Sequence, residues 1–180
     1  EIRFHPRLRR LGALLFFGYA FGWLGSMLYT LIVILDAIIG QQISIAAAAA
    51  IMRRLQAAGL TDPAAIRAAG PDGLRACGVS APKIRYLTGI VADEPDWAAL
   101  RDAPDADVIA TLTALPGIGQ WTAEIYLAFA LGRTDAFPAG DLALQESARL
   151  LYGLEDRPNP KQLIELAEPW RPWRSVAARA

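Results

Sequence analysis

The chain has 180 residues, 54% of them apolar and 20% charged, so it can bury the core of one ordinary domain and is not a disordered chain. Eighteen basic and eighteen acidic side chains cancel, which excludes a polybasic scaffold but not a local basic patch. The single cysteine, Cys77, excludes disulfides and cysteine-ligated metal clusters within this chain, and the single histidine, His5, argues against histidine-based metal catalysis and a Ser–His–Asp triad.

The N-terminal region contains a long uncharged run. No charged residue occurs from Leu11 to Leu35, and several arginines precede the run. This pattern meets the formal test for a transmembrane helix or an uncleaved signal anchor. Four glycines within the run would fragment a soluble helix, although a bilayer tolerates them better. The pattern alone therefore leaves two interpretations open, a membrane span and a pair of segments buried within a globular domain.

Downstream of this run the chain predicts helices joined by short turns. Good helix formers, mainly Ala and Leu, dominate, and strand-type alternation is almost absent. Capping residues and prolines mark the ends of the predicted helices, which are residues 43–58, 63–70, 81–92, 106–114 and 142–152, a helix from 160 and a last helix from Pro172. The sequence therefore predicts an all-α domain built as two lobes.

A tight turn is predicted at Leu115–Gly119, between one helix that ends there and another that begins near Gln120. A helix–hairpin–helix of this kind aims the backbone N–H groups of Gly117 to Thr122 outward from a positive helix terminus. Such groups bind phosphate without reading bases. The alternative is a helix corner whose glycines serve packing only, and the pentapeptide by itself does not choose between the two.

Asp141 follows Pro138-Ala139-Gly140 and precedes the helical run 142–152. Aspartate is a favoured N-cap, so this residue could do no more than cap that helix. A carboxylate held at a rigid loop–helix junction could also stabilise positive charge that develops on a sugar, and could orient water. The two roles are compatible.

Taken together, these features resemble one known family. The hairpin, Trp121-Thr122-Ala123, the Asp135-Ala-Phe-Pro run and Asp141 are similar to the helix–hairpin–helix DNA glycosylase superfamily, and to its 3-methyladenine DNA glycosylase II branch. The resemblance covers Gly40 to Ala180. It implies an all-α, two-lobed fold with the active site in the cleft between the lobes, and excision of alkylated bases after the nucleotide is flipped out of the duplex.

The resemblance also implies roles for three side chains. Asp141 matches the catalytic aspartate, and Ile125 stands where some relatives have a pocket aromatic. Trp121 occupies the position of the Schiff-base lysine of bifunctional members, and because indole offers no amine, the chain is expected to be a monofunctional glycosylase. Methylation at N3 or N7 makes a purine cationic, so Trp121 would bind such a base through cation–π stacking. A core tryptophan is the alternative for Trp121.

For DNA binding, the resemblance places Gln42 as the side chain that fills the gap left by the flipped nucleotide, with a solvated helix-start residue as its alternative. Gly117, Gly119, Gln120 and Thr122 would contact phosphates. The expected partner is double-stranded DNA containing alkylated bases, bound by a monomer. No cofactor is required, but a monovalent cation is expected at backbone carbonyls of the hairpin, namely those of Thr113, Leu115 and Ile118.

The remaining basic side chains and the single cysteine are not expected to belong to the functional site. The four basic residues that could add phosphate contacts are better explained as exposed, solvated side chains: Arg53, Arg54, Lys83 and Arg85. Cys77 is expected to be a small buried hydrophobe.

The resemblance also sets the expected domain limits. Residues 1–39 form an apolar N-terminal segment within the glycosylase body, and residues 40–180 form the helix–hairpin–helix domain, with the hairpin at 113–122. Because the segment after residue 27 is an internal helix of the family fold, a cytoplasmic protein is favoured over a membrane-associated one. The family's last helix continues beyond Ala180 to a pocket aromatic, so a truncated C-terminus is expected. Two alternatives remain: a non-catalytic DNA-binding module, and a membrane-associated protein with a degenerate glycosylase body.

Overall fold

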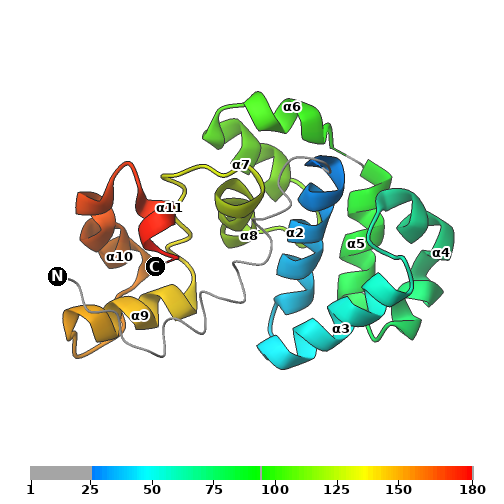
Figure 1. Ribbon diagram of the computed structural model, residues 1–180, viewed down its shortest axis with the longest axis horizontal. Helices are drawn as coiled ribbons and strands as arrows, with labels where there is room; N and C mark the ends of the chain where they lie inside the picture. Colours follow the sequence, from blue (N-terminus) through cyan, green and yellow to red (C-terminus); the bar gives the residue numbers. More distant parts are fainter. Residues whose placement is uncertain (1–25, 94, 180) are drawn as a thin grey trace. The chain divides into compact units, whose positions relative to one another are not determined.

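The computed structural model describes residues 26–93 and 95–179, and the regular elements in those ranges are all helical (Figure 1). In chain order they are α2 (Ser26–Gly40), α3 (Ile45–Ala57), α4 (Pro63–Ala76), α5 (Ala81–Asp93), α6 (Trp97–Asp102), α7 (Asp105–Thr113), α8 (Gln120–Ile125), the π-helical η2 (Tyr126–Ala130), α9 (Leu142–Tyr152), α10 (Pro160–Ala167), the 3-10 turn η3 (Glu168–Trp170) and α11 (Arg174–Ala177). The predicted all-α class is confirmed. The elements form two compact units, one of Met27–Leu131 and one that includes Gly132–Ala180.

Helix α2 lies at the core of the first unit. Its apolar side chains are at most 1% exposed at five positions: Leu31, Ile34, Leu35, Ile38 and Ile39. A helix with this many buried apolar positions belongs inside a protein core. The last part of the uncharged run is therefore buried helix, whereas residues 11–25 lie outside the described residues. None of the helices within residues 26–93 and 95–179 combines the length and the hydropathy that a membrane span requires.

Most of the predicted helix starts are confirmed by their caps. Asp62 accepts the N–H of Ala65 at the start of α4, as predicted. Helix α3 begins at Ile45, after the predicted start at residue 43, and Ser44 accepts the N–H of Ala47 as its cap. Asn159 and Gln162 form a reciprocal capping box at the start of α10. These short polar side chains satisfy N–H groups that the first turn of a helix leaves without partners.

Helix α4 differs from the prediction of a helix that ends at Gly70. Gly70 has φ 60° and ψ −167° and kinks the helix, which then resumes and continues to Ala76. Pro71 stands at the first position after the kink, where its missing N–H costs nothing. α4 packs against α5, beside it in Figure 1, and Cys77 at the end of α4 is buried, as expected.

The second unit has its own apolar core. Phe137 and Ala139 from the loop before α9 pack with Ala148, Leu163 and Ala167. Trp170 meets Phe137 edge-on with ring centroids 6.0 Å apart. The last helix begins at Arg174 and not at Pro172, because Trp173 donates its N–H to the Trp170 carbonyl at 2.7 Å and so continues the preceding turn.

Candidate active site

The turn at Leu115–Gly119 joins α7 to α8, as predicted. Gly117 has φ 79°, a left-handed conformation that disfavours side chains, and a Cβ added there would lie 2.3 Å from Cγ of Tyr86. Ile118 is 5% exposed and anchors the turn in the core, and its N–H donates to the Leu115 carbonyl at 3.3 Å. The backbone angle and the close packing therefore both require glycine at 117.

The backbone N–H groups predicted to bind phosphate lie in the turn and at the start of α8. Gly119 is its N-cap, and the N–H of Ala123 donates to the Gly119 carbonyl at 3.1 Å. The first N–H groups of an α-helix have no partner in its own ladder. Gly119 and Gln120 are exposed, but Thr122 is only 2% exposed. The Thr122 side chain thus lies inside the protein, and only its backbone could approach DNA.

Trp121 and Ile125 lie four residues apart on α8, so they share a face, and both are half-buried. Glu124, which is not among the predicted site residues, lies one residue before Ile125 and accepts a hydrogen bond from Gln120 Nε2 at 2.8 Å. Desolvation raises the pKa of Glu124, and the hydrogen bond from Gln120 acts in the opposite direction. The i, i+4 spacing of Gln120 and Glu124 is the sequence feature from which this side-chain contact could have been predicted.

Gln42 lies in the short loop between α2 and α3. It is exposed and has φ 58°, which is unusual for a residue other than glycine. Its apolar neighbours Ile43 and Ile45 are 39% and 66% exposed. The side chain of the preceding residue, Gln41, donates to the Gly117 carbonyl at 3.1 Å, which joins this loop to the hairpin.

Lys83 is only 9% exposed, so the expectation of a solvated side chain is wrong for this residue. Its ammonium donates to the carbonyls of Ile39 at 2.7 Å and Gln41 at 2.8 Å, and burial lowers its pKa. Arg53 and Arg85 are exposed, as expected, whereas Arg54 is exposed but also donates from Nε to the Cys77 carbonyl at 2.7 Å. No local pattern predicts the Lys83 contacts, because the bonded residues are more than forty positions apart.

Asp141 caps α9 over Leu142–Tyr152, the helix predicted for it. Its Oδ1 accepts the N–H groups of Ala143 at 2.8 Å and Leu144 at 2.9 Å, and the residue is half-buried. Its own N–H donates to the Pro138 carbonyl at 2.9 Å. These three bonds fix the carboxylate at the junction between loop and helix.

Gln145 fastens the same loop from within α9. It is 6% exposed, and its Nε2 donates to the Ala139 carbonyl at 2.8 Å. Its burial is not predictable from the sequence, since a glutamine four residues into a helix is normally a surface residue. Gln145 can hold the loop because the loop bends back over the helix and brings the Ala139 carbonyl within reach of the Gln145 amide.

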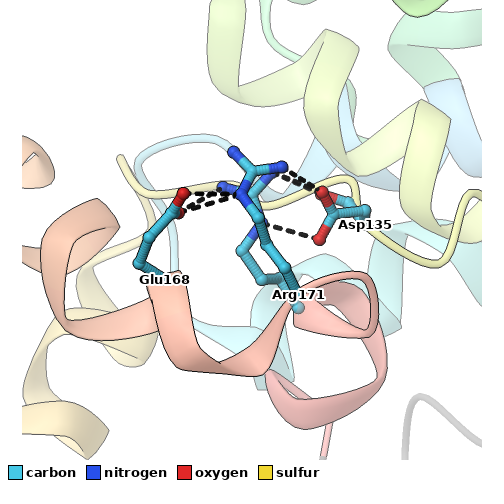
Figure 2. Close-up of polar contacts among 4 residues, drawn as sticks. Asp135, Glu168 and Arg171 are labelled. Atoms are coloured by element: carbon cyan, nitrogen blue, oxygen red, sulfur yellow. Dashed lines mark hydrogen bonds and ion pairs between the residues drawn. The ribbon is translucent and has the colours of Figure 1, made fainter.

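An ionic cluster holds the segment that leads to this loop (Figure 2). Arg174 donates from Nε to Asp135 Oδ1 and from Nη2 to Asp135 Oδ2, both at 2.8 Å. Arg171 lies between Asp135 and Glu168 and bonds both, with Nε 2.8 Å from Glu168 Oε1 (Figure 2). The hydrogen bond from Arg174 is the main cause that holds the pKa of Asp135 below its ordinary value, and the charges of both arginines add to it. The cluster therefore ties the segment before Asp141 to the end of the chain.

Asp135→Asn is expected to lower the free energy of unfolding by roughly 1–3 kcal/mol at pH 7, since it removes the anion from a bidentate arginine pair. The pKa of Asp135 is lower in the folded state, so this contribution is present above the unfolded pKa of about 3.9 and is lost as pH falls through the folded pKa. Urea unfolding of both proteins at pH 7 and pH 3 measures it. Asp72→Asn, which removes an exposed pair with Arg75, is the control and should change little. An equal difference at both pH values would contradict the prediction.

The predicted cation ligands lie on the hairpin and just before it. The Thr113 hydroxyl donates to the Ile109 carbonyl at 2.7 Å, and the carbonyl of Leu115 accepts from Ile118. The nearby Gly117 carbonyl is engaged by Gln41. Within the described ranges there is no group of three or more His, Cys, Asp or Glu side chains suited to a metal ion.

The structure brings together some of the predicted site residues. Gln42, the hairpin, Trp121 and Ile125 belong to the unit Met27–Leu131, and the bond from Gln41 to Gly117 connects two of these parts directly. Asp141 belongs to the other unit, together with Asp135.

Comparison with known proteins gives a consistent result. The family model described as HhH-GPD superfamily base excision DNA repair protein matches residues 35–172. The chain is 32% identical over 154 residues to DNA-3-methyladenine glycosylase 1 of Schizosaccharomyces pombe, covering 81% of this chain and 68% of that protein. It is 30% identical over 113 residues to the alkylbase DNA glycosidase-like protein mag2 of the same organism, covering 59% of this chain and 53% of that protein. The chain thus spans between about half and two thirds of these relatives.

A solved structure of the S. pombe 3-methyladenine DNA glycosylase Mag1 in complex with abasic DNA is also similar. The TM-score is 0.76 at 31% identity, with 83% of this chain and 77% of that chain covered. The fold similarity therefore extends over most of this chain.

Proposed function

The chain belongs to the HhH-GPD superfamily of base excision DNA repair proteins, and on that basis we propose that it is a monofunctional DNA glycosylase of the 3-methyladenine II type. It would hydrolyse the N-glycosidic bond of alkylated purines, such as 3-methyladenine and 7-methylguanine, in double-stranded DNA. The observation that carries the proposal is that the hairpin Leu115–Gly119 is followed by Asp141, held as the cap of α9 by three backbone bonds. The proposed place of action is inside the cell, at chromosomal DNA.

Asp141 is proposed as the catalytic carboxylate. Glycosidic cleavage passes through a sugar with oxocarbenium character, which a fixed negative charge stabilises. The capping bonds from Ala143 and Leu144 hold Asp141 in one orientation, so little reorganisation accompanies the reaction. An alkylated purine is already cationic and is a good leaving group, so the site does not need a strong general acid.

Trp121 and Ile125 are proposed to bind the flipped base. Trp121 is half-buried on α8, which suits a ring that offers one face to a ligand and packs with the other. Stacking of a cationic purine on indole is favourable and distinguishes it from an undamaged base. Trp121 offers no amine, so no Schiff base can form with the abasic product at this position.

The hairpin and the loop at Gln42 are proposed to hold the DNA. The backbone amides at Gly117, Gly119, Gln120 and Thr122 would face phosphates. Gln42 would fill the gap left by the flipped nucleotide, and the exposed apolar side chains beside it, Ile43 and Ile45, suit contact with unstacked bases.

A monovalent cation is proposed at the hairpin. The neutral carbonyl oxygens of Thr113, Leu115 and Ile118 are a donor set that suits a hard, weakly bound cation and not a transition metal. Such an ion would supply positive charge beside a DNA phosphate.

A second candidate function is a non-catalytic DNA-binding module, favoured by the fact that capping alone explains the Asp141 bonds to Ala143 and Leu144. The two candidates predict different products from the same duplex.

A duplex with a single 3-methyladenine is expected to be converted by the purified chain to an abasic strand that breaks only after alkali treatment. No protein–DNA adduct should be trapped by borohydride, because Trp121 has no amine to form one. Gel electrophoresis with and without alkali reads both results. Strand breaks without alkali, or a trapped adduct, would contradict the monofunctional proposal, and no alkali-labile site at all would favour the module.

A further inference from the structure

The ammonium of Lys83, in α5, binds backbone carbonyls beside the loop that carries Gln42. It donates to the carbonyls of Ile39, 2.7 Å away, and Gln41, 2.8 Å away. Ile39 lies in the last turn of α2, at the negative end of the helix dipole, and Gln41 is the first residue after the helix. Burial of an ammonium costs free energy, and the two bonds to this end offset the cost. The two hydrogen bonds from Lys83 therefore restrain the loop that carries Gln42.

Gln42 needs such a support. Of the described residues, it alone combines a positive φ with a side chain. A residue with a Cβ keeps this conformation only where its surroundings fix it. Lys83 bonds the carbonyl of Gln41, immediately before Gln42, so it restrains the peptide unit that sets the direction of the Gln42 side chain.

The hairpin rests on the same helix. Tyr86 lies against Gly117, where an added Cβ would be 2.3 Å from the ring atom Cγ. Gly89 leaves room for Pro116, whose Cγ would be 2.8 Å from a Cβ placed on Gly89. Lys83, Tyr86 and Gly89 follow at intervals of three residues, so each lies beside the next in one row along α5.

Gln41 closes the arrangement directly. Its Nε2 donates to the Gly117 carbonyl at 3.1 Å, while its own carbonyl accepts from Lys83. The Gln42 loop and the hairpin are therefore joined to α5 and to one another by side chains that would not touch DNA under the proposed function.

We infer that this row of residues along α5 fixes the register between the gap-filling side chain of Gln42 and the phosphate-binding hairpin, with Lys83 and Gln41 as positioning residues for nucleotide flipping. The inference rests on the proposed function. Undamaged duplex needs only the phosphate contacts, whereas a duplex with an extrahelical nucleotide or a gap needs the hairpin and Gln42 engaged at a fixed spacing. Loss of the bonds made by Lys83 or Gln41 should then weaken binding to a duplex with an extrahelical nucleotide or a gap more than binding to undamaged duplex.

The test compares affinity for a duplex containing an abasic-site analogue with affinity for the undamaged duplex. Lys83→Met and Gln41→Ala are expected to lower this selectivity by about tenfold, with affinity for undamaged duplex nearly unchanged. The matched controls are Lys161→Met, at the chain's other lysine, and Gln56→Ala; both residues are exposed, and both variants should keep wild-type selectivity.

Lys83→Met and Gln41→Ala are then each combined with Gln42→Ala. If Lys83 and Gln41 act through Gln42, the double variants lose no more selectivity than Gln42→Ala alone, a result that a general loss of stability would not produce. Unchanged selectivity in Gln41→Ala, or additive losses with Gln42→Ala, would overturn the inference. Should Lys83→Met fail to fold, Gln41→Ala decides, because its half-buried side chain leaves the core intact. Lack of abasic-site preference in the wild-type chain would instead overturn the proposed function.

Discussion

Asp141→Asn is expected to fold and to bind DNA but to excise alkylated bases at least about 100-fold more slowly, a loss of roughly 3 kcal/mol of transition-state stabilisation. Asparagine caps helices about as well as aspartate, so α9 keeps its bonds to Ala143 and Leu144. What disappears is the negative charge that the proposed function assigns to stabilising the oxocarbenium ion. Single-turnover excision from a methylated duplex measures the effect.

Asp96 provides the matched control. Its Oδ1 caps α6 by accepting the N–H groups of Ala98 at 3.1 Å and Ala99 at 3.0 Å, the same pattern as in Asp141. Asp96→Asn should therefore leave excision unchanged. If the two variants retained equal activity, Asp141 would be a helix cap and nothing more.

Gly117→Val is expected to abolish DNA binding and to destabilise the fold by about 3 kcal/mol or more. A side chain at φ 79° is strained, and its Cβ would overlap the Tyr86 ring. The hairpin must therefore shift away from α5, and its amides lose their arrangement. Thermal unfolding and a binding titration against an undamaged duplex together measure both effects.

Gly119→Val separates the fold from the contact with DNA. Gly119 has φ −98°, which any residue adopts, and no atom lies within 4 Å of an added Cβ. This variant should fold but bind every duplex about tenfold more weakly, whatever its sequence, because the side chain blocks the approach of the phosphates. Loss of damage selectivity alone, with undamaged binding retained, would contradict the phosphate-binding role of the hairpin.

The parts that the sequence predicts well are those fixed by local chemistry. Asp141 caps 142–152 because a short carboxylate suits the first turn of a helix, and the hairpin forms because Gly117 permits a left-handed backbone. Even the error at Gly70 is local: the sequence predicts that the helix ends there, whereas Gly70 only kinks it and the helix resumes after the kink.

The parts that the sequence does not predict are contacts between distant residues. Lys83 binds carbonyls more than forty positions away, and Arg174 reaches Asp135 across 39 positions. A lysine or an arginine in a helix is compatible with solvent exposure until tertiary packing supplies its partners. Burial of Gln145 is hidden in the same way, because the loop must bend back before Ala139 can accept its amide.

The most direct test of the central claim is the release of free base from methylated duplex DNA by the purified chain, followed by chromatography. The proposal predicts that 3-methyladenine and 7-methylguanine appear in solution, that one abasic site forms for each base released, and that Asp141→Asn releases about 100-fold less. Tight binding to the same DNA with no free base released would contradict the enzyme and leave a DNA-binding module.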